Sequence, residues 1–113
     1  MAYTTAGKHG MLAAFKANVT KVVLYDDYGV MIDEKKNIGW KDPGVDALNG
    51  EMVMSNNEIV FNVPAGTVVA EVGLETDLGT EWARSTVAEE KFVNAGTYTL
   101  IYVKVDLNAV PEE

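Results

Sequence analysis

The amino-acid sequence predicts an all-β domain, a two-layer antiparallel β-sandwich of jelly-roll or Ig-like kind with a short N-terminal helix. Several segments alternate apolar and polar side chains with a period of two, which gives each strand one face for a core. Turn-forming Gly, Pro, Asn and Asp residues separate these segments at short intervals, as they do in antiparallel sandwiches and barrels. The 113 residues suit one domain, residues 1–113, which can bury a core without disulfide bonds.

The N-terminal segment, residues 1–18, has the helical pattern. Thr4 or Thr5 can cap its start, because a hydroxyl oxygen there accepts a backbone N–H. Apolar residues then recur at helical spacing and form a stripe: Met11, Leu12 and Phe15. Two glycines in the segment each cost about 1 kcal/mol relative to alanine, so the helix needs a surface to pack against. The stripe either packs on a neighbouring molecule or closes one end of the chain's own sandwich.

The next segment, residues 19–25, predicts a strand. It is rich in β-branched side chains and is apolar on both faces, as expected of a well-covered strand. Shorter strands are expected at residues 30–32, 51–54, 81–87 and 89–93.

The chain ends in a long expected strand, residues 97–107, followed by a tail at residues 108–113. On this strand Tyr98, Leu100 and Tyr102 share one face, which makes that face apolar. An apolar face on a terminal strand is a candidate contact surface for another molecule.

Residues 55–74 give the strongest β signal, and the rest of the chain is organised around them. Apolar side chains alternate along residues 59–63, and a second alternating run follows the turn. Pro64 suits a strand end because it lacks an N–H, and Gly66 can take the positive φ that a reversal needs. The stretch therefore predicts a two-stranded hairpin.

A faint repeat links that turn to a later one. The segment that begins at Phe61 and the segment that begins at Phe92 both lead through Ala-Gly-Thr into an alternating strand. The favoured interpretation is two hairpins of one sheet with the same turn chemistry, and the alternative is an internal duplication. We expect both phenylalanines to be buried at equivalent corners, and Gly66 and Gly96 to need positive φ or close packing.

Composition and charge exclude several classes of function. The net charge is −8, and the nine Lys and Arg residues are scattered, whereas a DNA-binding surface must be basic. No apolar run reaches the length of a membrane span, and no signal peptide is evident. The chain has no cysteine, which excludes disulfides, thiolate catalysis and cysteine-based zinc sites. The sequence thus predicts no nucleic-acid binding and no membrane insertion.

Residues capable of catalysis or metal binding lack partners at the spacing of known motifs. His9 has no Ser, Cys or Asp at catalytic spacing. The nearest approach to a metal cluster is acidic: Asp26, Asp27, Asp33 and Glu34. These four do not follow the order of a calcium-binding loop. We expect no enzymatic activity, no cofactor and no metal; a small hydrolase using Glu89, Glu90 or an Asp pair is the minor alternative.

Aromatic residues raise the question of a binding surface. Trp40, Trp82 and several tyrosines could line a sugar-binding or partner-binding face, although such residues are most often core and interface. The interface candidates come from the helix stripe, one tryptophan and the final strand: Met11, Leu12, Phe15, Trp40, Tyr98, Leu100 and Tyr102.

Several motifs occur in one order along nearly the whole chain. The first is Thr-x-Ala-x-Lys-x-x-Met-Leu, formed by Thr4, Ala6, Lys8, Met11 and Leu12. Next come the strand at residues 22–25, an acidic turn and Ser-Asn at 55–56. They are followed by Ile-x-Phe-Asn-Val-Pro-Ala-Gly-Thr at 59–67, Val-Gly-Leu at 72–74 and a closing Ala-Gly-Thr-Tyr-Thr-Leu at 95–100. In this order the chain resembles a family of short tailed-bacteriophage proteins, the tail fibre-like or minor tail proteins.

The resemblance implies a non-enzymatic virion component that is assembled in the host cytoplasm. It implies other virion proteins as partners, and we also expect a homo-oligomer. Within residues 26–50 the chain departs from the family, because Ile38-Gly39-Trp40 stands where the family often has a longer Gly-rich loop and Tyr-Ala-Arg. The alternatives are a capsid decoration protein of the virion head and a small glycan-binding module, with a host surface glycan as a further partner.

Overall fold

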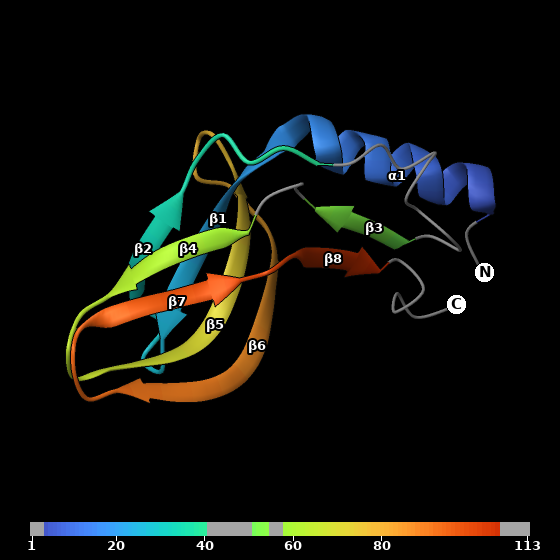
Figure 1. Ribbon diagram of the computed structural model, residues 1–113. Helices are drawn as coiled ribbons and strands as arrows, with labels where there is room; N and C mark the ends of the chain where they lie inside the picture. The colour runs from blue at the N-terminus through green and yellow to red at the C-terminus, as the bar shows by residue number, and fades with distance from the viewer. Residues whose placement is uncertain (1–3, 41–50, 55–57, 107–113) are drawn as a thin grey trace.

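The computed structural model describes residues 4–40, 51–54 and 58–106, and the tail expected at 108–113 lies outside them. Within these residues the chain forms a helix followed by strands (Figure 1). The elements are α1 (Thr5–Asn18), β1 (Val19–Asp26), β2 (Met31–Lys35), β3 (Glu51–Met54), β4 (Ile59–Val63), β5 (Thr67–Thr76), β6 (Glu81–Phe92), β7 (Gly96–Leu100) and β8 (Val103–Asp106). The predicted all-β, sandwich-like class with an N-terminal helix is confirmed.

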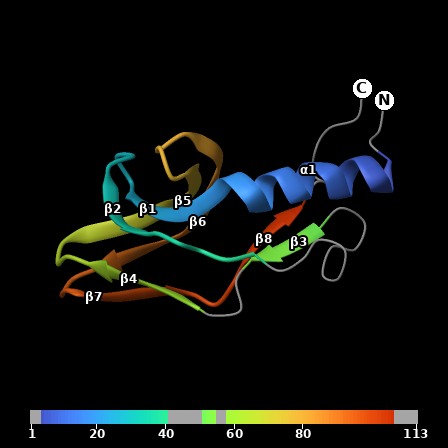
Figure 2. The same cartoon turned by 90° about the horizontal axis from the view of Figure 1, so that it is seen from above.

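Helix α1 begins where its cap was predicted. Thr4 Oγ1 accepts a hydrogen bond from the Gly7 N–H at 3.1 Å, which satisfies one of the free N–H groups of the first turn. The helix ends at Asn18 and leads directly into β1. Figures 1 and 2 show it extending past the larger sheet, alongside β3 and β8. No helix in the described part of the chain is long and apolar enough to cross a membrane.

The strands form three antiparallel groups. A four-stranded sheet has the order β2-β1-β5-β6, and two-stranded ribbons are formed by β4 with β7 and by β3 with β8. Seen from above, the β4–β7 ribbon lies against one face of the four-stranded sheet (Figure 2). Because β3 pairs with β8, β4 with β7 and β5 with β6, the pairing is nested. It is the pairing of one long hairpin folded over on itself, as in a jelly roll.

The predicted hairpin of residues 55–74 is wrong. Strand β4 pairs with β7, whereas β5 pairs with β1 and β6, so the turn at Pro64 carries the chain from one layer to the other. The period-two pattern identified both strands correctly, but it holds no information about which strand each one pairs with. A short turn between two strands can close a hairpin or change layers.

The two similar segments form one corner of this folded hairpin. Val63 pairs with Gly96, Thr67 pairs with Phe92, and the Gly66 N–H donates to the Phe92 carbonyl at 2.6 Å. The favoured interpretation, two hairpins of one sheet, is wrong. The segments lie side by side, and both cross between layers at the same place.

Both corner glycines meet the predicted condition. Gly66 has φ of +80°, a region that other residues rarely adopt. A Cβ on Gly96 would lie 3.2 Å from the ring of Phe92, so that position requires close packing. Phe61 is fully buried, as predicted, whereas Phe92 is half-buried and packs against the edge of the core.

Two strand boundaries differ from the prediction. Residues 81–87 and 89–92 belong to one strand, β6, whose pairing to β5 is irregular near the expected break, and Val93 lies beyond its end. The single strand expected at 97–107 is divided between β7 and β8 by Ile101 and Tyr102, both exposed. This interruption changes the phase of the side chains, so Tyr98 and Leu100 pack inward together with Val103 and Val105.

The core lies between the four-stranded sheet and the β4–β7 ribbon. Strand β4 alternates between buried and exposed positions, which places one face on the core. Strand β1 is buried on both faces, as predicted. The largest fully buried side chains are Phe61, Leu12, Leu24, Val19, Val22, Val23 and Val69.

Candidate functional site

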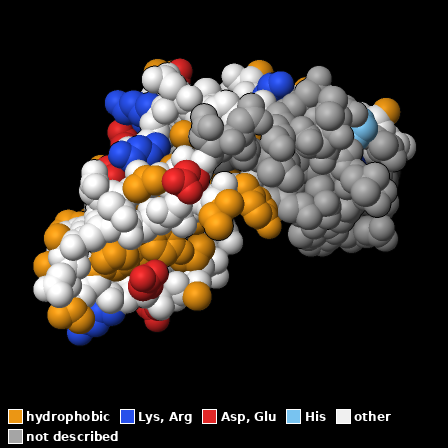
Figure 3. Space-filling view, in the orientation of Figure 1, with side chains coloured by type: hydrophobic (Ala, Val, Ile, Leu, Met, Phe, Trp, Pro, Cys, Tyr) orange, Lys and Arg blue, Asp and Glu red, His pale blue; other side chains and the backbone are white. Residues whose placement is uncertain are grey.

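The sandwich is incompletely closed between β6 and β7. Within the described residues β6 pairs only with β5, and β7 pairs only with β4, so the other edge of each strand makes no sheet contact. Inward-facing apolar side chains along these strands are only half-buried against the core: Val87, Phe92, Tyr98 and Leu100. We call these four residues the seam. Hydrophobic side chains gather on the face over β7 and between β7 and β6 (Figure 3).

Tyr98 lies at the seam, close to an acidic residue of β6. Burial raises the pKa of the Tyr98 hydroxyl, and the negative charge of Glu90 raises it further. The hydroxyl is therefore neutral at physiological pH, which keeps this part of the seam uncharged. Glu90 itself is exposed, so the seam is an apolar strip with a carboxylate beside it.

The seven predicted interface residues divide into two groups. Tyr98 and Leu100 belong to the seam, and Tyr102 is 58% exposed beyond the end of β7. The other four lie at the helix end of the molecule: Met11, Leu12, Phe15 and Trp40. Leu12 and Trp40 are buried in the chain's own core, and Phe15 packs against it. Of the two interpretations of the helix stripe, Leu12 and Phe15 support the one in which the stripe closes one end of the chain's own sandwich.

An aromatic cluster fixes the helix to the sandwich. The ring of Phe15 meets Trp40 edge-to-face, with centroids 5.2 Å apart, and meets Trp82 in the same way at 5.7 Å. The Trp40 indole N–H donates to the Val19 carbonyl at 2.7 Å, so its polar atom is satisfied although the side chain is buried. Trp82 is 44% exposed, so the cluster reaches the surface.

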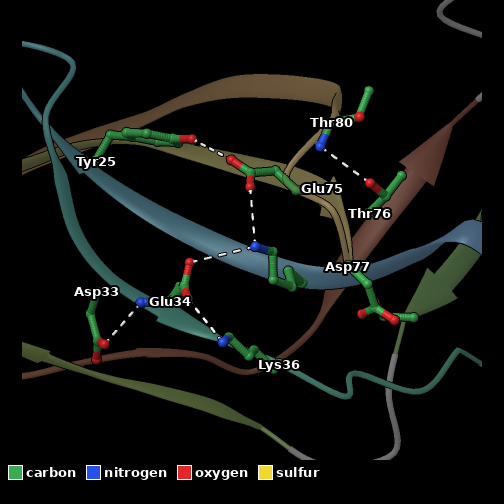
Figure 4. Close-up of polar contacts among 10 residues, drawn as sticks. Tyr25, Asp33, Glu34, Lys36, Glu75, Thr76, Asp77 and Thr80 are labelled. Atoms are coloured by element: carbon green, nitrogen blue, oxygen red, sulfur yellow. Dashed lines mark hydrogen bonds and ion pairs between the residues drawn. The ribbon is translucent and has the colours of Figure 1, made fainter.

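A polar network covers the outer face of the four-stranded sheet, which is the face opposite the β4–β7 ribbon. Lys21 on β1 lies between two carboxylates, 3.8 Å from Glu34 on β2 and 3.7 Å from Glu75 on β5 (Figure 4). Glu75 also accepts a hydrogen bond from the Tyr25 hydroxyl at 2.8 Å. The ion pairs are made across strands, because these residues occupy neighbouring positions in the sheet register.

The Tyr25 ring is held between a glycine and an arginine. Gly73 pairs with Val23, and a Cβ at Gly73 would come within 2.8 Å of the Tyr25 ring. Arg84 lies on β6, and its guanidinium carbon is 3.7 Å from the centroid of the Tyr25 ring, which is a cation–π contact. Arg84 also forms ion pairs with Glu71 and Glu81.

The contacts of the network raise the pKa values of two of its groups, Tyr25 and Arg84. Burial, followed by the hydrogen bond to Glu75, raises the pKa of Tyr25 to about 12. The hydrogen bond to Glu81 raises the pKa of Arg84 above its ordinary value. A general acid or base works best with a pKa near the operating pH, and neither group meets that condition. The arrangement therefore stabilises the sheet and offers no evident acid–base chemistry through these two groups.

Three of the four acidic residues singled out in the sequence, Asp26, Asp33 and Glu34, have structural contacts. Asp26 Oδ1 accepts from the N–H groups of Tyr28 and Val30 and so shapes the β1–β2 turn. Asp33 Oδ2 accepts from the Asn62 N–H at 2.9 Å, which ties β2 to β4. Among the residues that the structure describes, no three His, Cys, Asp or Glu side chains are grouped so as to hold a metal ion.

Comparison with known proteins adds no relative. No protein-family model, no curated protein and no solved structure matches this chain.

Proposed function

We propose that this chain is a non-enzymatic structural protein of a tailed-bacteriophage virion, of the tail fibre-like or minor tail type. It associates with copies of itself or with other virion proteins, and its contact surface is the seam between β6 and β7. Assembly takes place in the host cytoplasm, and the assembled virion is where the protein acts. A capsid decoration protein of the head is the alternative within the same class.

The half-buried seam is the observation that carries the proposal. Apolar surface left in water is unfavourable by roughly 25 cal/mol per Å², so a strip of four large side chains favours coverage by another molecule. Unpaired strand edges add backbone donors and acceptors that a second strand can satisfy. A virion subunit is used in many symmetric copies, and each copy needs such a contact.

The residues that resemble the phage family support the same proposal. The long motif at residues 59–67 and the closing motif at 95–100 form the folded corner, and the closing motif includes the seam residues Tyr98 and Leu100. The motifs thus coincide with the part of the fold that sets the seam. The glycan-binding alternative is supported by a different observation, the exposed Trp82.

The virion assignment is tested by asking whether purified particles contain the chain. We expect mass spectrometry to find it in gradient-purified phage and antibodies against it to label intact particles in electron micrographs. Particles from a phage with this gene deleted are the control and should show no label. Absence of the chain from purified particles, with the protein abundant in the infected lysate, would contradict the assignment.

A further inference from the structure

A second surface feature lies where the helix meets the sheet. A hollow of about 380 Å³ is lined by residues from the end of α1, the start of β1, the β5–β6 turn and Trp82. Its size falls in the range of small-molecule sites, roughly 300–1,000 Å³. It is separate from the seam, since the two share no lining residue.

Trp82 gives the hollow a fixed aromatic wall. Trp82 is 44% exposed, yet its ring packs edge-to-face with Phe15, which packs in the same way with Trp40. Because the ring is already oriented, little side-chain entropy is lost when a ligand stacks on it. A flat, rigid, exposed indole favours a ligand with a flat apolar face.

Polar groups stand around this ring in fixed positions. Asp77 accepts a hydrogen bond on Oδ1 from the Thr20 hydroxyl, and its second oxygen receives none from the described residues. The turn that carries Asp77 is ordered by the Thr80 N–H, which donates to Thr76 Oγ1 at 3.2 Å (Figure 4). The Asn18 side-chain N–H donates to the Ala14 carbonyl at 2.7 Å, which leaves its amide oxygen to accept from a ligand.

We propose that this hollow binds a neutral sugar, with one pyranose ring stacked on Trp82 and its hydroxyl groups donating to Asp77 and Asn18. A pyranose has an apolar C–H face and a rim of hydroxyl groups, which matches an aromatic wall beside acceptors. Nucleotide bases also stack on tryptophan, but their phosphates are disfavoured beside Asp77 on a chain of net charge −8. The inference does not rest on the virion assignment.

To test this, the purified protein is titrated with sugars, and binding is measured by ligand-observed NMR and by calorimetry. The panel contains the methyl pyranosides of glucose, galactose, mannose and N-acetylglucosamine, and their β-linked disaccharides. We expect saturable binding of at least one of them and a loss of at least about tenfold in affinity for Trp82→Ala, equal to about 1.4 kcal/mol. Tyr102→Ala, which removes an exposed aromatic ring outside the hollow, should bind like the wild type.

A second variant keeps the test valid if Trp82→Ala disturbs the aromatic cluster. Asp77→Asn leaves the ring in place and should weaken binding by several-fold, while the circular dichroism spectrum stays unchanged. Three results would overturn the inference. They are absence of binding across the whole panel, binding by Trp82→Ala and Asp77→Asn as tight as that of the wild type, and tighter binding of AMP than of any sugar. Leu100→Lys at the seam should retain sugar binding, so failure of the virion proposal is distinguishable from failure of this one.

Discussion

The outer face of the four-stranded sheet and the seam both carry apolar side chains, but the chain covers these side chains only on the outer face. On the outer face, Val23 is 1% exposed although it points away from the β4–β7 ribbon. Lys21 and Tyr25 flank it on the same strand face, and two ion pairs of Lys21 and one hydrogen bond of Tyr25 fix them over the sheet. At the seam, Tyr98 and Leu100 remain half-buried.

The difference shows how a small sandwich covers the apolar side chains of an outer face without a second layer. Long charged side chains have apolar stems that shield neighbours, provided that oppositely charged partners hold them in place. The outer face has such partners on all three strands that share the sheet with β1, namely β2, β5 and β6. The seam lies between two strand edges that do not pair in the described chain, so it has no equivalent set. We infer that the seam is covered by another molecule.

The largest expected effect comes from the core itself and gives a scale for the seam. Phe61→Ala should cost about 3–5 kcal/mol of unfolding free energy, because Phe61 is fully buried. Phe92→Ala should cost clearly less in the monomer, because Phe92 is half-buried at the seam. Chemical denaturation of both variants measures the difference. Equal losses would show that the seam is as closed as the core.

A substitution at Gly73, beneath the Tyr25 ring, should destabilise the packing on the outer face. Gly73→Ala places a Cβ 2.8 Å from that ring, and such overpacking costs about 1–3 kcal/mol. Gly10→Ala is the matched control, because nothing lies within 4 Å of its Cβ and alanine favours the helix by about 1 kcal/mol. Opposite signs of the change in melting temperature are expected. A stabilised Gly73→Ala would mean that the ring does not lie over this glycine.

The smallest expected effect is a dependence on alkaline pH. The pKa of Tyr25 is about 12 in the folded chain and 10.0 ordinarily, so the folded state holds the proton more tightly. This stabilisation is complete below pH 10 and is lost as the pH rises from 10 to 12. Tyr25→Phe removes it, so the difference in melting temperature between wild type and variant should shrink over that interval. Parallel curves would contradict the assigned contacts of Tyr25.

Local features of the fold were predictable from the sequence. The cap at Thr4, the strand at residues 19–25, the burial of Phe61 and the special role of Gly66 all follow from rules that involve near neighbours in the chain. The pairing of β4 with β7 was not predictable, because a turn sequence does not specify whether the chain folds back in one sheet or changes layer.

The candidate sites were only partly predictable, for a similar reason. Tyr98 and Leu100 were identified as apolar residues on one face, but the break at Ile101 and Tyr102 reverses the direction in which later residues point. The outer network was missed, although charged residues at alternate positions of an otherwise apolar strand, Glu71 and Glu75, were a usable signal. Their partners on β1 and β6 depend on the register, which the sequence does not state.

Light scattering of the wild type beside one matched pair of variants tests the central claim about the seam most directly. Leu100→Lys places a charge in the seam, and Thr99→Lys places the same charge on the exposed side of the same strand. We expect the wild type and Thr99→Lys to form a concentration-dependent oligomer and Leu100→Lys to remain a folded monomer; Val87→Lys, also in the seam, repeats the test from β6. A wild type that stays monomeric and does not bind purified tails or capsids, or a Leu100→Lys variant that assembles like the wild type, would contradict the account.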